Sequence, residues 1–489
     1  MRTPSALPPE PLPPAALHHA CTLQGLDFTT TADLPDLPDV PGVLGQARAR
    51  EAVEYAVGQR AQGYNLYVLG RPGLGRTTLV RDVLAARAPT EAAPADWCYV
   101  NNFSQPHRPR ALRLPRGRGQ EFRQDVQQLA EELRASIPAL FESDEYRNRA
   151  EQLDAEITEQ QQETFIALGK EAAEQGVALL HTPAGFSLAP AQGDEVMTPD
   201  TFKQLPEEER ERIEELLHSF QDKLQKAIRH VQQLQKEKRN RIKELDREMC
   251  MAAVGISIDE LRSRWQLPPV LEFLAELQSD VLEHLDEFRR QADAEPAPGM
   301  RQEVSLLQRY GVNVVVGEDG EADGAPIVFE DHPTFGNLLG RVEYVARFGT
   351  LVTDYSQVKP GALHRANGGY LVLDARQLLN QPFAWDGLKR ALRTREIRTE
   401  SLGQTYGMIS TAALEPEPIP LDVKVVLVGE RLLYHLLLAY DPEFSELFRI
   451  PADFEDEVER TAEHESLYAH LVATMARRED ALPLGRDAV

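Results

Sequence analysis

A glycine-rich segment at residues 64–78 has the spacing of a loop that binds phosphate groups. The segment reads YNLYVLGRPGLGRTT, in which four residues separate Gly70 from Gly75 and a cation, Arg76, precedes Thr77. Glycines let the backbone direct its N–H groups toward an anion, and a helix that begins after the loop points the positive end of its dipole at the same place. Because a threonine hydroxyl can bind Mg²⁺, the segment predicts a site for a nucleoside triphosphate with Mg²⁺.

One residue of this loop departs from the usual pattern. Arg76 stands where lysine is expected, and a guanidinium is a wide planar fork rather than a compact ammonium, so it would hold the phosphates differently. The alternative interpretation is a glycine turn that only lets a helix pack on a sheet, but the flanking strand and helix patterns favour a phosphate loop. The candidate binding residues are Gly70, Arg71, Pro72, Gly73, Leu74, Gly75, Arg76, Thr77 and Thr78.

A phosphate loop of this kind needs an acidic residue at the end of another buried strand to hold Mg²⁺. Asp374 meets this need, because it follows the apolar run 371–373 at the carboxyl end of a predicted strand, where open α/β sheets bind ligands. Asp374 could also cap the helix that follows, which is compatible with a metal role. Position 375 is alanine, where many hydrolytic enzymes have a glutamate that polarises water. The sequence therefore predicts nucleotide binding and leaves hydrolysis open.

Composition restricts the class of protein and its partners. The 489 residues suffice for about three domains or for one large domain with insertions. The net charge of −25 argues against nucleic acid or an anionic membrane surface as a partner. Three separated cysteines form no zinc or disulfide pattern, and no apolar run approaches the length of about 18 residues that could cross a membrane. We expect a soluble, cytoplasmic protein without a membrane segment.

Strand patterns place the phosphate loop and Asp374 in one α/β core that is interrupted and then resumed. Residues 41–104 read as a helix, a buried strand ending at Leu69, a second helix and another buried strand at 97–103, which predicts a β-α-β unit. The strand pattern returns over 321–456 in the apolar runs PIVFED, GTLVTDY, GGYLVLDA and DVKVVLVG. Residues 1–40 are rich in proline and are predicted to be a flexible lead-in.

Residues 105–320 form a polar, helical insertion between the two parts of the core. A helix over 144–175 with a weaker apolar stripe could pair with a second, heptad-bearing helix, and residues 176–190 predict a β-hairpin around Ala184-Gly185. We expect an antiparallel helical hairpin, in which a coiled coil ends in a small β tip; a compact helical bundle is the alternative. The heptad seam of the second helix is Ile213, Leu217, Phe220, Leu224, Ala227, Val231 and Leu234.

Several longer blocks resemble the AAA+ ATPases, and particularly their Lon-like branch. These blocks are GALHRANGGYLVLD, KRALRTREIRTESLG and VLGQARAREAV. Taken with WCYVNNF, FGNLLGRVEY and DPEFSELFRIPADFED, they make residues 41–489 similar to a family of Lon-like ATP-dependent proteases whose AAA+ domain carries a long helical insertion. The resemblance implies an α/β fold with a P-loop NTPase (AAA+) core, and ATP with Mg²⁺ as cofactors.

The resemblance also implies roles for individual residues. The loop from Gly70 to Thr78 would hold the triphosphate, Thr77 and Asp374 would serve Mg²⁺, and the strand end at Gly429 and Glu430 would be the sensor region. Arg449, in ELFRIP, stands where an arginine finger reaches the nucleotide of a neighbouring subunit. That role would imply a homo-oligomeric ring, usually a hexamer; a surface arginine without such a role is the alternative.

The expected function follows from the same resemblance. Lon-like proteases cleave proteins with a serine-lysine dyad in a carboxyl-terminal domain. In this sequence we expect residues 457–489 to form the start of a helical lid that is truncated. We expect a module that binds ATP and engages or gates protein substrates for such a peptidase. The alternative is a scaffold without ATP hydrolysis, whose nucleotide is structural or absent. A chromosome-maintenance ATPase is disfavoured by the missing serine-glycine-glycine signature and by the net charge of −25.

Overall fold

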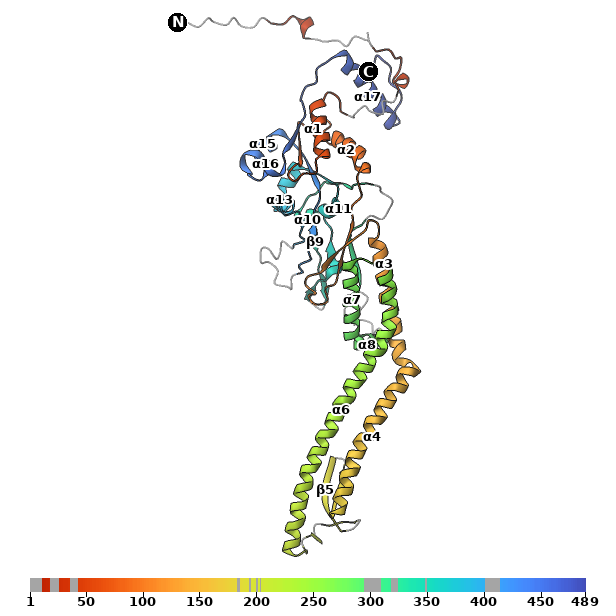
Figure 1. The fold of residues 1–489 in the computed structure, drawn as a ribbon. Helices are drawn as coiled ribbons and strands as arrows, with labels where there is room; N and C mark the ends of the chain where they lie inside the picture. The colour runs from red at the N-terminus through yellow and green to blue at the C-terminus, as the bar shows by residue number, and fades with distance from the viewer. Residues whose placement is uncertain are drawn as a thin grey trace, which may run out of the picture. The chain divides into compact units, whose positions relative to one another are not determined.

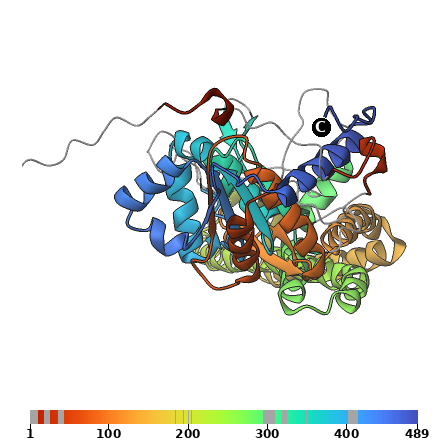
Figure 2. The ribbon, with the colours of Figure 1, turned by 90° about the horizontal axis from the view of Figure 1, so that it is seen from above.

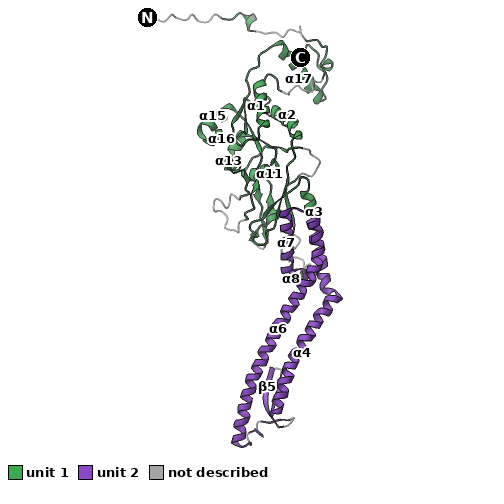
Figure 3. Cartoon of the chain, in the orientation of Figure 1, with its two compact units in different colours: residues 1–122, 312–489 green, residues 123–311 purple. Residues whose placement is uncertain are grey.

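The computed structural model divides the chain into two compact units, which Figure 3 distinguishes by colour. Unit 1 comprises residues 1–122 and 312–489, and unit 2 comprises residues 123–311. Each unit is described by itself below. The structure describes residues 11–17, 26–35, 43–182, 185–192, 195–198, 201–202, 204–293, 309–317, 324–347, 350–400 and 414–489.

A five-stranded parallel sheet forms the centre of unit 1, with the strand order β17-β1-β16-β13-β8. The side chains of β1 and β16 are buried along their whole length, as expected for a parallel sheet that is covered on both faces. This sheet confirms the predicted α/β class. Its strands are β1 (Leu66–Leu69), β8 (Ile327–Glu330), β13 (Tyr370–Asp374), β16 (Lys424–Gly429) and β17 (Ile450–Asp453).

Helices cover both faces of this sheet. Successive side chains of a strand point to opposite faces, so these apolar strands present side chains to be buried on each face. Leu66 and Val68 of β1 pack in one core with α1 (Ala47–Gly58) and α2 (Arg76–Arg87), whereas Tyr67 packs on the other face. The segment η3 (Ala88–Thr90) follows α2. The second face carries α10 (Phe335–Leu339), α11 (Ala362–Arg365), α12 (Ala375–Asn380), α13 (Ala384–Thr394), α15 (Arg431–Tyr440) and α16 (Phe444–Leu447).

A second, antiparallel sheet corrects the prediction of a β-α-β unit. The strand predicted at 97–103 is β2 (Asp96–Val100), and it pairs with β3 (Arg110–Leu114) and β7 (Val312–Val316) rather than joining the parallel sheet. The apolar run predicted a buried strand correctly but carried no information about its partners. Both β3 and β7 belong to unit 1, and unit 2 comprises residues 123–311, within the predicted insertion 105–320.

Several two-stranded pairs complete unit 1. The run GTLVTDY, which was predicted as a core strand, contains β11, and β11 pairs with β10 in a hairpin outside the large sheet. The backbone N–H and C=O groups of so short a run can form their hydrogen bonds in a local hairpin as well as in a large sheet. The pairs join β9 (Arg341–Val342) to β12 (Val358–Lys359), β10 (Val345–Arg347) to β11 (Thr350–Val352), and β14 (Glu396–Ile397) to β15 (Ile419–Pro420), and η4 (Tyr355–Gln357) precedes β12.

Part of the segment predicted as a flexible lead-in packs on the other end of the chain. Residues 26–35, which include η2 (Thr31–Asp33), lie against α17 (Ala462–Arg478), as Figure 2 shows. Leu26 and Phe28 are buried with Ala469 of α17. Proline content predicted extended chain but could not reveal these apolar partners. The short η1 (Pro14–Ala16) is also described.

Unit 2 is built around two long antiparallel helices, α4 (Asp144–Glu174) and α6 (Glu207–Arg264) (Figure 1). Lys223 pairs with Glu171 at 2.6 Å and Arg241 pairs with Glu156 at 3.1 Å, so residue numbers rise along one helix as they fall along the other. The 58 residues of α6 span about 87 Å. The other helices are α3 (Gly119–Glu142), which begins in unit 1, α7 (Pro268–Glu283) and α8 (Leu285–Asp293).

The predicted heptad seam contributes the contacts between these helices and a small sheet. Phe220, Leu224 and Ala227 of α6 are buried with Leu168 of α4 and Val177. The predicted hairpin is present, with Thr182 paired to Gly185, although Ala184 lies outside the described residues. Its sheet contains β4 (Val177–Thr182), β5 (Gly185–Gln192) and β6 (Glu195–Val196). Throughout the described ranges, no helix has the length and apolarity that would let it span a membrane.

A buried histidine in unit 1 predicts sensitivity to acid. His364 is fully buried in α11, and its Nδ1 accepts a hydrogen bond from the Gly361 N–H at 3.1 Å, while its Nε2 has no partner among the described residues. Burial lowers the pKa of His364 to about 4. Between about pH 6.5 and pH 4 the unfolded chain therefore binds a proton that the folded chain does not.

We expect this difference to destabilise the fold as the pH falls through that window, by up to about 3 kcal/mol. The variant H364N lacks the titrating group, so its thermal midpoint should fall less than that of the wild type between pH 7 and pH 5. Differential scanning calorimetry measures the thermal midpoint of both proteins as a function of pH. An equal fall of the two midpoints would show that His364 does not cause the loss of stability in acid.

Candidate functional site

Three strands of the parallel sheet end side by side at the position of the predicted site. β16 lies between β1 and β13, with Leu69 paired to Gly429 and Asp374 paired to Val428. Adjacent strands are about 4.8 Å apart, so the loop after β1 and the carboxylate after β13 are separated by about two strand spacings. The fold thus brings together two groups that are distant in the sequence, at the edge where open α/β sheets bind ligands.

The glycine-rich loop connects β1 to α2 and is packed on one side and open on the other. Gly75 is the N-cap of α2 with φ 79°, a left-handed conformation that favours glycine. A Cβ atom on Gly75 would lie 2.3 Å from Cγ2 of Val43, and one on Gly70 would lie 2.8 Å from Cβ of Phe454. A Cβ on Gly73 would meet nothing within 4 Å. The open side leaves room for an anion beside the first N–H groups of α2, which lack partners inside the helix.

Arg76 does not extend into that open space. Its guanidinium is half-buried, and Nη1 donates a hydrogen bond to the carbonyl oxygen of Gly429 at the end of β16. Burial lowers the pKa of Arg76, and the nearby carboxylates of Asp374 and Glu430 oppose this shift. The positive charge therefore lies between the loop and the acidic strand end, close to where the sequence predicted Mg²⁺.

The predicted ligands of Mg²⁺ are accessible at this edge. Thr77 and Asp374 are both exposed, and Asp374 also caps α12 by accepting a hydrogen bond from the Gln377 N–H at 2.9 Å. No cluster of three or more histidine, cysteine or acidic side chains that could hold a metal occurs in the parts of the chain that the structure describes. Mg²⁺ usually keeps several waters and binds one or two carboxylates with substrate phosphates, so a hydroxyl and one carboxylate are a suitable set.

The end of β16 contributes polar groups that the sequence analysis had noted only in part. Glu430 accepts a hydrogen bond from Nη2 of Arg376 at 2.8 Å, which holds its carboxylate at the edge. Tyr67 of β1 donates its hydroxyl to the Glu430 carbonyl oxygen at 3.3 Å, and burial raises the pKa of that hydroxyl. Tyr67 and Arg376 were missed, although a tyrosine inside an apolar strand run is a signal for a polar partner nearby.

An ion-pair network joins the loop to the end of β17. Arg71 of the loop lies 3.3 Å from Asp456, measured from Nε to Oδ2. Arg431, the first residue of α15, pairs with both Asp456 at 2.7 Å and Asp453 at 2.8 Å. These side chains are at least partly exposed, so the network orients the loop more than it stabilises the fold.

Arg449 lies at the amino-terminal ends of the parallel strands, whereas the phosphate loop lies at their carboxyl ends. It directly precedes β17, which runs parallel to β1, so the length of a four-residue strand, about 13 Å, separates it from the phosphate loop. Arg449 is exposed, and its guanidinium carbon lies 5.4 Å from the centre of the Tyr64 ring. The structure therefore does not bring Arg449 together with the other predicted site residues within one chain.

Two parts of the chain match models of known protein families. Residues 323–455 match the family described as LonB-like, AAA domain, and residues 96–129 match the family described as Lon-like LonC helical domain. The first range contains Asp374 and Arg449, and neither range contains the phosphate loop. The chain is also 29% identical over 204 residues to a putative Lon protease homolog from Escherichia coli strain K12.

The similarity to that relative is partial. It covers 40% of this chain and 32% of the Escherichia coli protein, so the chain spans about a third of the length of the curated relative it matches. Among solved structures, the crystal structure of NtrX from Brucella abortus is 19% identical over 32% of each chain, with a TM-score of 0.23. A score that low supports no further statement about this chain.

Proposed function

The chain contains a Lon-like AAA+ module, and from this premise we propose that it binds ATP with Mg²⁺ and uses the nucleotide to engage or gate protein substrates for a serine-lysine peptidase. The observation that carries the proposal is the register of the parallel sheet, which sets the glycine loop, Gly429 and Asp374 at one edge. The charge and composition of the chain fit a cytoplasmic setting for this activity.

Each group at this edge has a part in the proposed binding. The loop from Gly70 to Thr78 and the first N–H groups of α2 would bind the phosphates, and Thr77 with Asp374 would hold Mg²⁺. Bound Mg²⁺ would neutralise charge on the phosphate oxygens. Ala375 cannot polarise water, and we propose that Glu430, whose carboxylate accepts a hydrogen bond from Arg376 at 2.8 Å, does so instead.

The position of Arg449 supports assembly into a ring. An exposed guanidinium at the edge opposite the phosphate loop is out of reach of the nucleotide bound by its own chain. It would instead stabilise charge on the phosphates bound by a neighbouring copy, as an arginine finger does. We therefore propose a homo-oligomeric ring, with a hexamer as the expected size.

The experiment that tests nucleotide binding is a thermal shift with Mg-ATP. A ligand that binds only the folded state stabilises it by about 2.7 kcal/mol at a hundredfold excess over Kd. We expect the thermal midpoint to rise at millimolar Mg-ATP, and release of inorganic phosphate measured in the same samples reports turnover. An unchanged midpoint would contradict the proposal.

A second candidate function, a scaffold without ATP hydrolysis, is favoured by the hydrogen bond between Arg76 and Gly429. That bond holds the loop cation away from the open side of the loop, so a phosphate must compete for it. A shift of the midpoint without phosphate release would indicate a nucleotide-gated switch, and the absence of both would indicate the scaffold.

The variant R76K distinguishes a restrained loop from a lost site. A lysine is compact and cannot reproduce the planar guanidinium contact, so its ammonium should be free to bind phosphate. Because a hydrogen bond from a charged donor contributes about 1.5–3 kcal/mol, we expect R76K to bind Mg-ATP on the order of tenfold more tightly than the wild type. Isothermal titration calorimetry measures both affinities, and the exposed R71K, made in the same loop, is the matched control. Weaker binding by R76K would show that the guanidinium itself contacts the nucleotide.

A further inference from the structure

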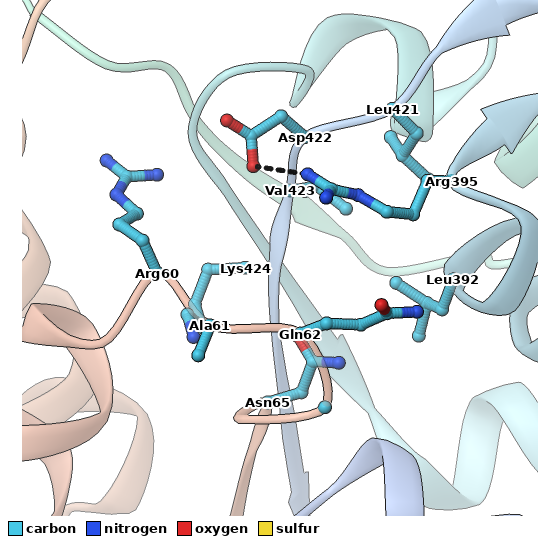
Figure 4. A pocket seen from close by; sticks show the side chains of 11 residues that line it. Arg60, Ala61, Gln62, Asn65, Leu392, Arg395, Leu421, Asp422, Val423 and Lys424 are labelled. Atoms are coloured by element: carbon cyan, nitrogen blue, oxygen red, sulfur yellow. Dashed lines mark ion pairs between the residues drawn. The ribbon is translucent and has the colours of Figure 1, made fainter.

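A small cavity lies at the amino-terminal ends of β1 and β16, whereas the phosphate loop follows the carboxyl end of β1. Its volume is about 50 Å³, and Figure 4 shows the side chains that line it. Three cations come to it from separate elements: Arg60 from the segment before β1, Arg395 from the end of α13, and Lys424 from the start of β16. Asp422 is the acidic residue among the lining side chains.

Lys424 is the least exposed of these cations. Its exposed fraction is 5%, and Nζ donates a hydrogen bond to the Tyr64 carbonyl oxygen at 2.7 Å. Burial, and then the charge of Arg60, lower the pKa of Lys424 to about 8, so the ammonium is still charged at pH 7. A buried charge is costly unless it is paired. A carbonyl oxygen satisfies one of its three N–H groups and supplies no compensating negative charge.

The neighbouring acidic groups neutralise the cavity only in part, although the charge of Asp422 acts on Lys424 and opposes the fall in its pKa. Arg60 pairs with Glu91, which also accepts the hydroxyl of Tyr370, so that carboxylate is already engaged. Asp422 lies 4.0 Å from Arg395, and both side chains are more than half exposed, which makes their attraction weak. The cavity therefore keeps positive charge in a protein whose net charge is −25.

The backbone of Arg395 adds a second, independent observation. Arg395 ends α13 with φ 57°, in the left-handed region where glycine is the usual residue. A bulky side chain is strained there, and such strain clusters at binding sites. In Figure 4 the guanidinium of Arg395 points toward Asp422, and the dashed line marks the ion pair between them.

We propose that this cavity binds one small tetrahedral oxyanion, a phosphate group, between Lys424 and Arg395. A volume of about 50 Å³ is several times what one water requires, about 10–15 Å³, so the cavity has room for a small anion. The anion would add negative charge beside Lys424 and would accept hydrogen bonds from the planar guanidinium of Arg395. The site is separate from the phosphate loop, because it lies at the opposite ends of β1 and β16.

The test is thermal unfolding of the full chain at pH 7 in increasing sodium phosphate, with sodium chloride adjusted to hold the ionic strength constant. We expect the midpoint to rise by about 2 °C when phosphate exceeds its Kd a few-fold. Sulfate should act similarly, and acetate, which has one planar carboxylate, should not. No rise beyond chloride, or an equal rise with acetate, would overturn the proposal.

Three variants locate the effect. K424M removes the buried charge while keeping a side chain of similar length, so it should fold and should lose the phosphate shift. R395Q changes an exposed side chain and should reduce the phosphate-induced rise of the thermal midpoint at least about threefold. If K424M does not fold, R395Q alone tests the proposal. R76A, in the phosphate loop, should keep the full shift. A shift lost in R76A and kept in K424M would place phosphate in the loop and overturn the cavity assignment, whereas the Mg-ATP response tests the proposed function separately.

Discussion

Replacing Asp374 with asparagine should weaken the binding of Mg-ATP by at least about tenfold while leaving the fold intact. Asparagine is as good an N-cap as aspartate, so Oδ1 can still accept the hydrogen bond that Asp374 now takes from the Gln377 N–H at 2.9 Å. What the substitution removes is the negative charge that would hold Mg²⁺. Isothermal titration calorimetry with ATP, in the presence of Mg²⁺ and then of EDTA, separates the two contributions.

The EDTA measurement makes this test specific. Without the metal, D374N and the wild type should bind ATP equally, because the phosphates contact the loop and not Asp374. D422N, which changes an exposed aspartate at the opposite edge of the sheet, is the control and should match the wild type in both buffers. If D374N keeps the full Mg²⁺ dependence, the acidic strand end does not hold the metal.

Shortening the pair of long helices should abolish the capture of protein substrates and spare the nucleotide. In a variant that lacks residues 162–234, a short glycine-serine linker can join Gln161 to Gln235, since Nε2 of Gln235 lies 3.4 Å from Oε1 of Gln161. The salt bridge between Glu156 and Arg241, at 3.1 Å, remains near the join to hold the shortened helices together. The change lies within unit 2, so the parallel sheet of unit 1 is untouched.

Fluorescence anisotropy of dye-labelled casein with Mg-ATP present measures capture by the shortened variant. We expect an affinity below detection, while the Kd for Mg-ATP stays within about twofold of the wild-type value. The charge-swapped E171K/K223E keeps an ion pair at the same place, where the atoms are now 2.6 Å apart, and should still capture casein. Capture by the shortened variant would show that substrates bind elsewhere.

The sequence predicted the parts of the site that depend on local patterns. Glycine spacing after an apolar run located the loop between β1 and α2, and Asp374 was placed correctly at the end of β13 because a strand end is visible in the sequence. The same apolar run explains why the side chains of β1 are buried alternately in the two cores on either face of the sheet. Local spacing therefore determines where a residue lies along an element.

Side-chain directions and non-local partners could not be predicted in this way. Nothing in the spacing indicates that Arg76 turns to the carbonyl of Gly429, because that carbonyl belongs to a strand far away in the sequence. The pairing of β2 with β7 across the insertion was missed for the same reason. Lys424 stands within the apolar run DVKVVLVG, and only the fold shows that it is buried at a cavity.

The most direct test of the central claim is electron-nuclear double resonance of the protein with ATP and Mn²⁺, which replaces Mg²⁺. The claim is that the glycine loop and Asp374 hold one triphosphate and its metal together. With aspartate labelled with ¹³C, it predicts ³¹P couplings from the phosphates and a ¹³C coupling from an aspartate carboxylate to the protein-bound Mn²⁺ in the wild type. The ³¹P couplings should remain in D374N, because ATP itself binds Mn²⁺, and the ¹³C coupling should be lost. No ¹³C coupling in the wild type, or a ¹³C coupling that persists in D374N, would contradict the claim.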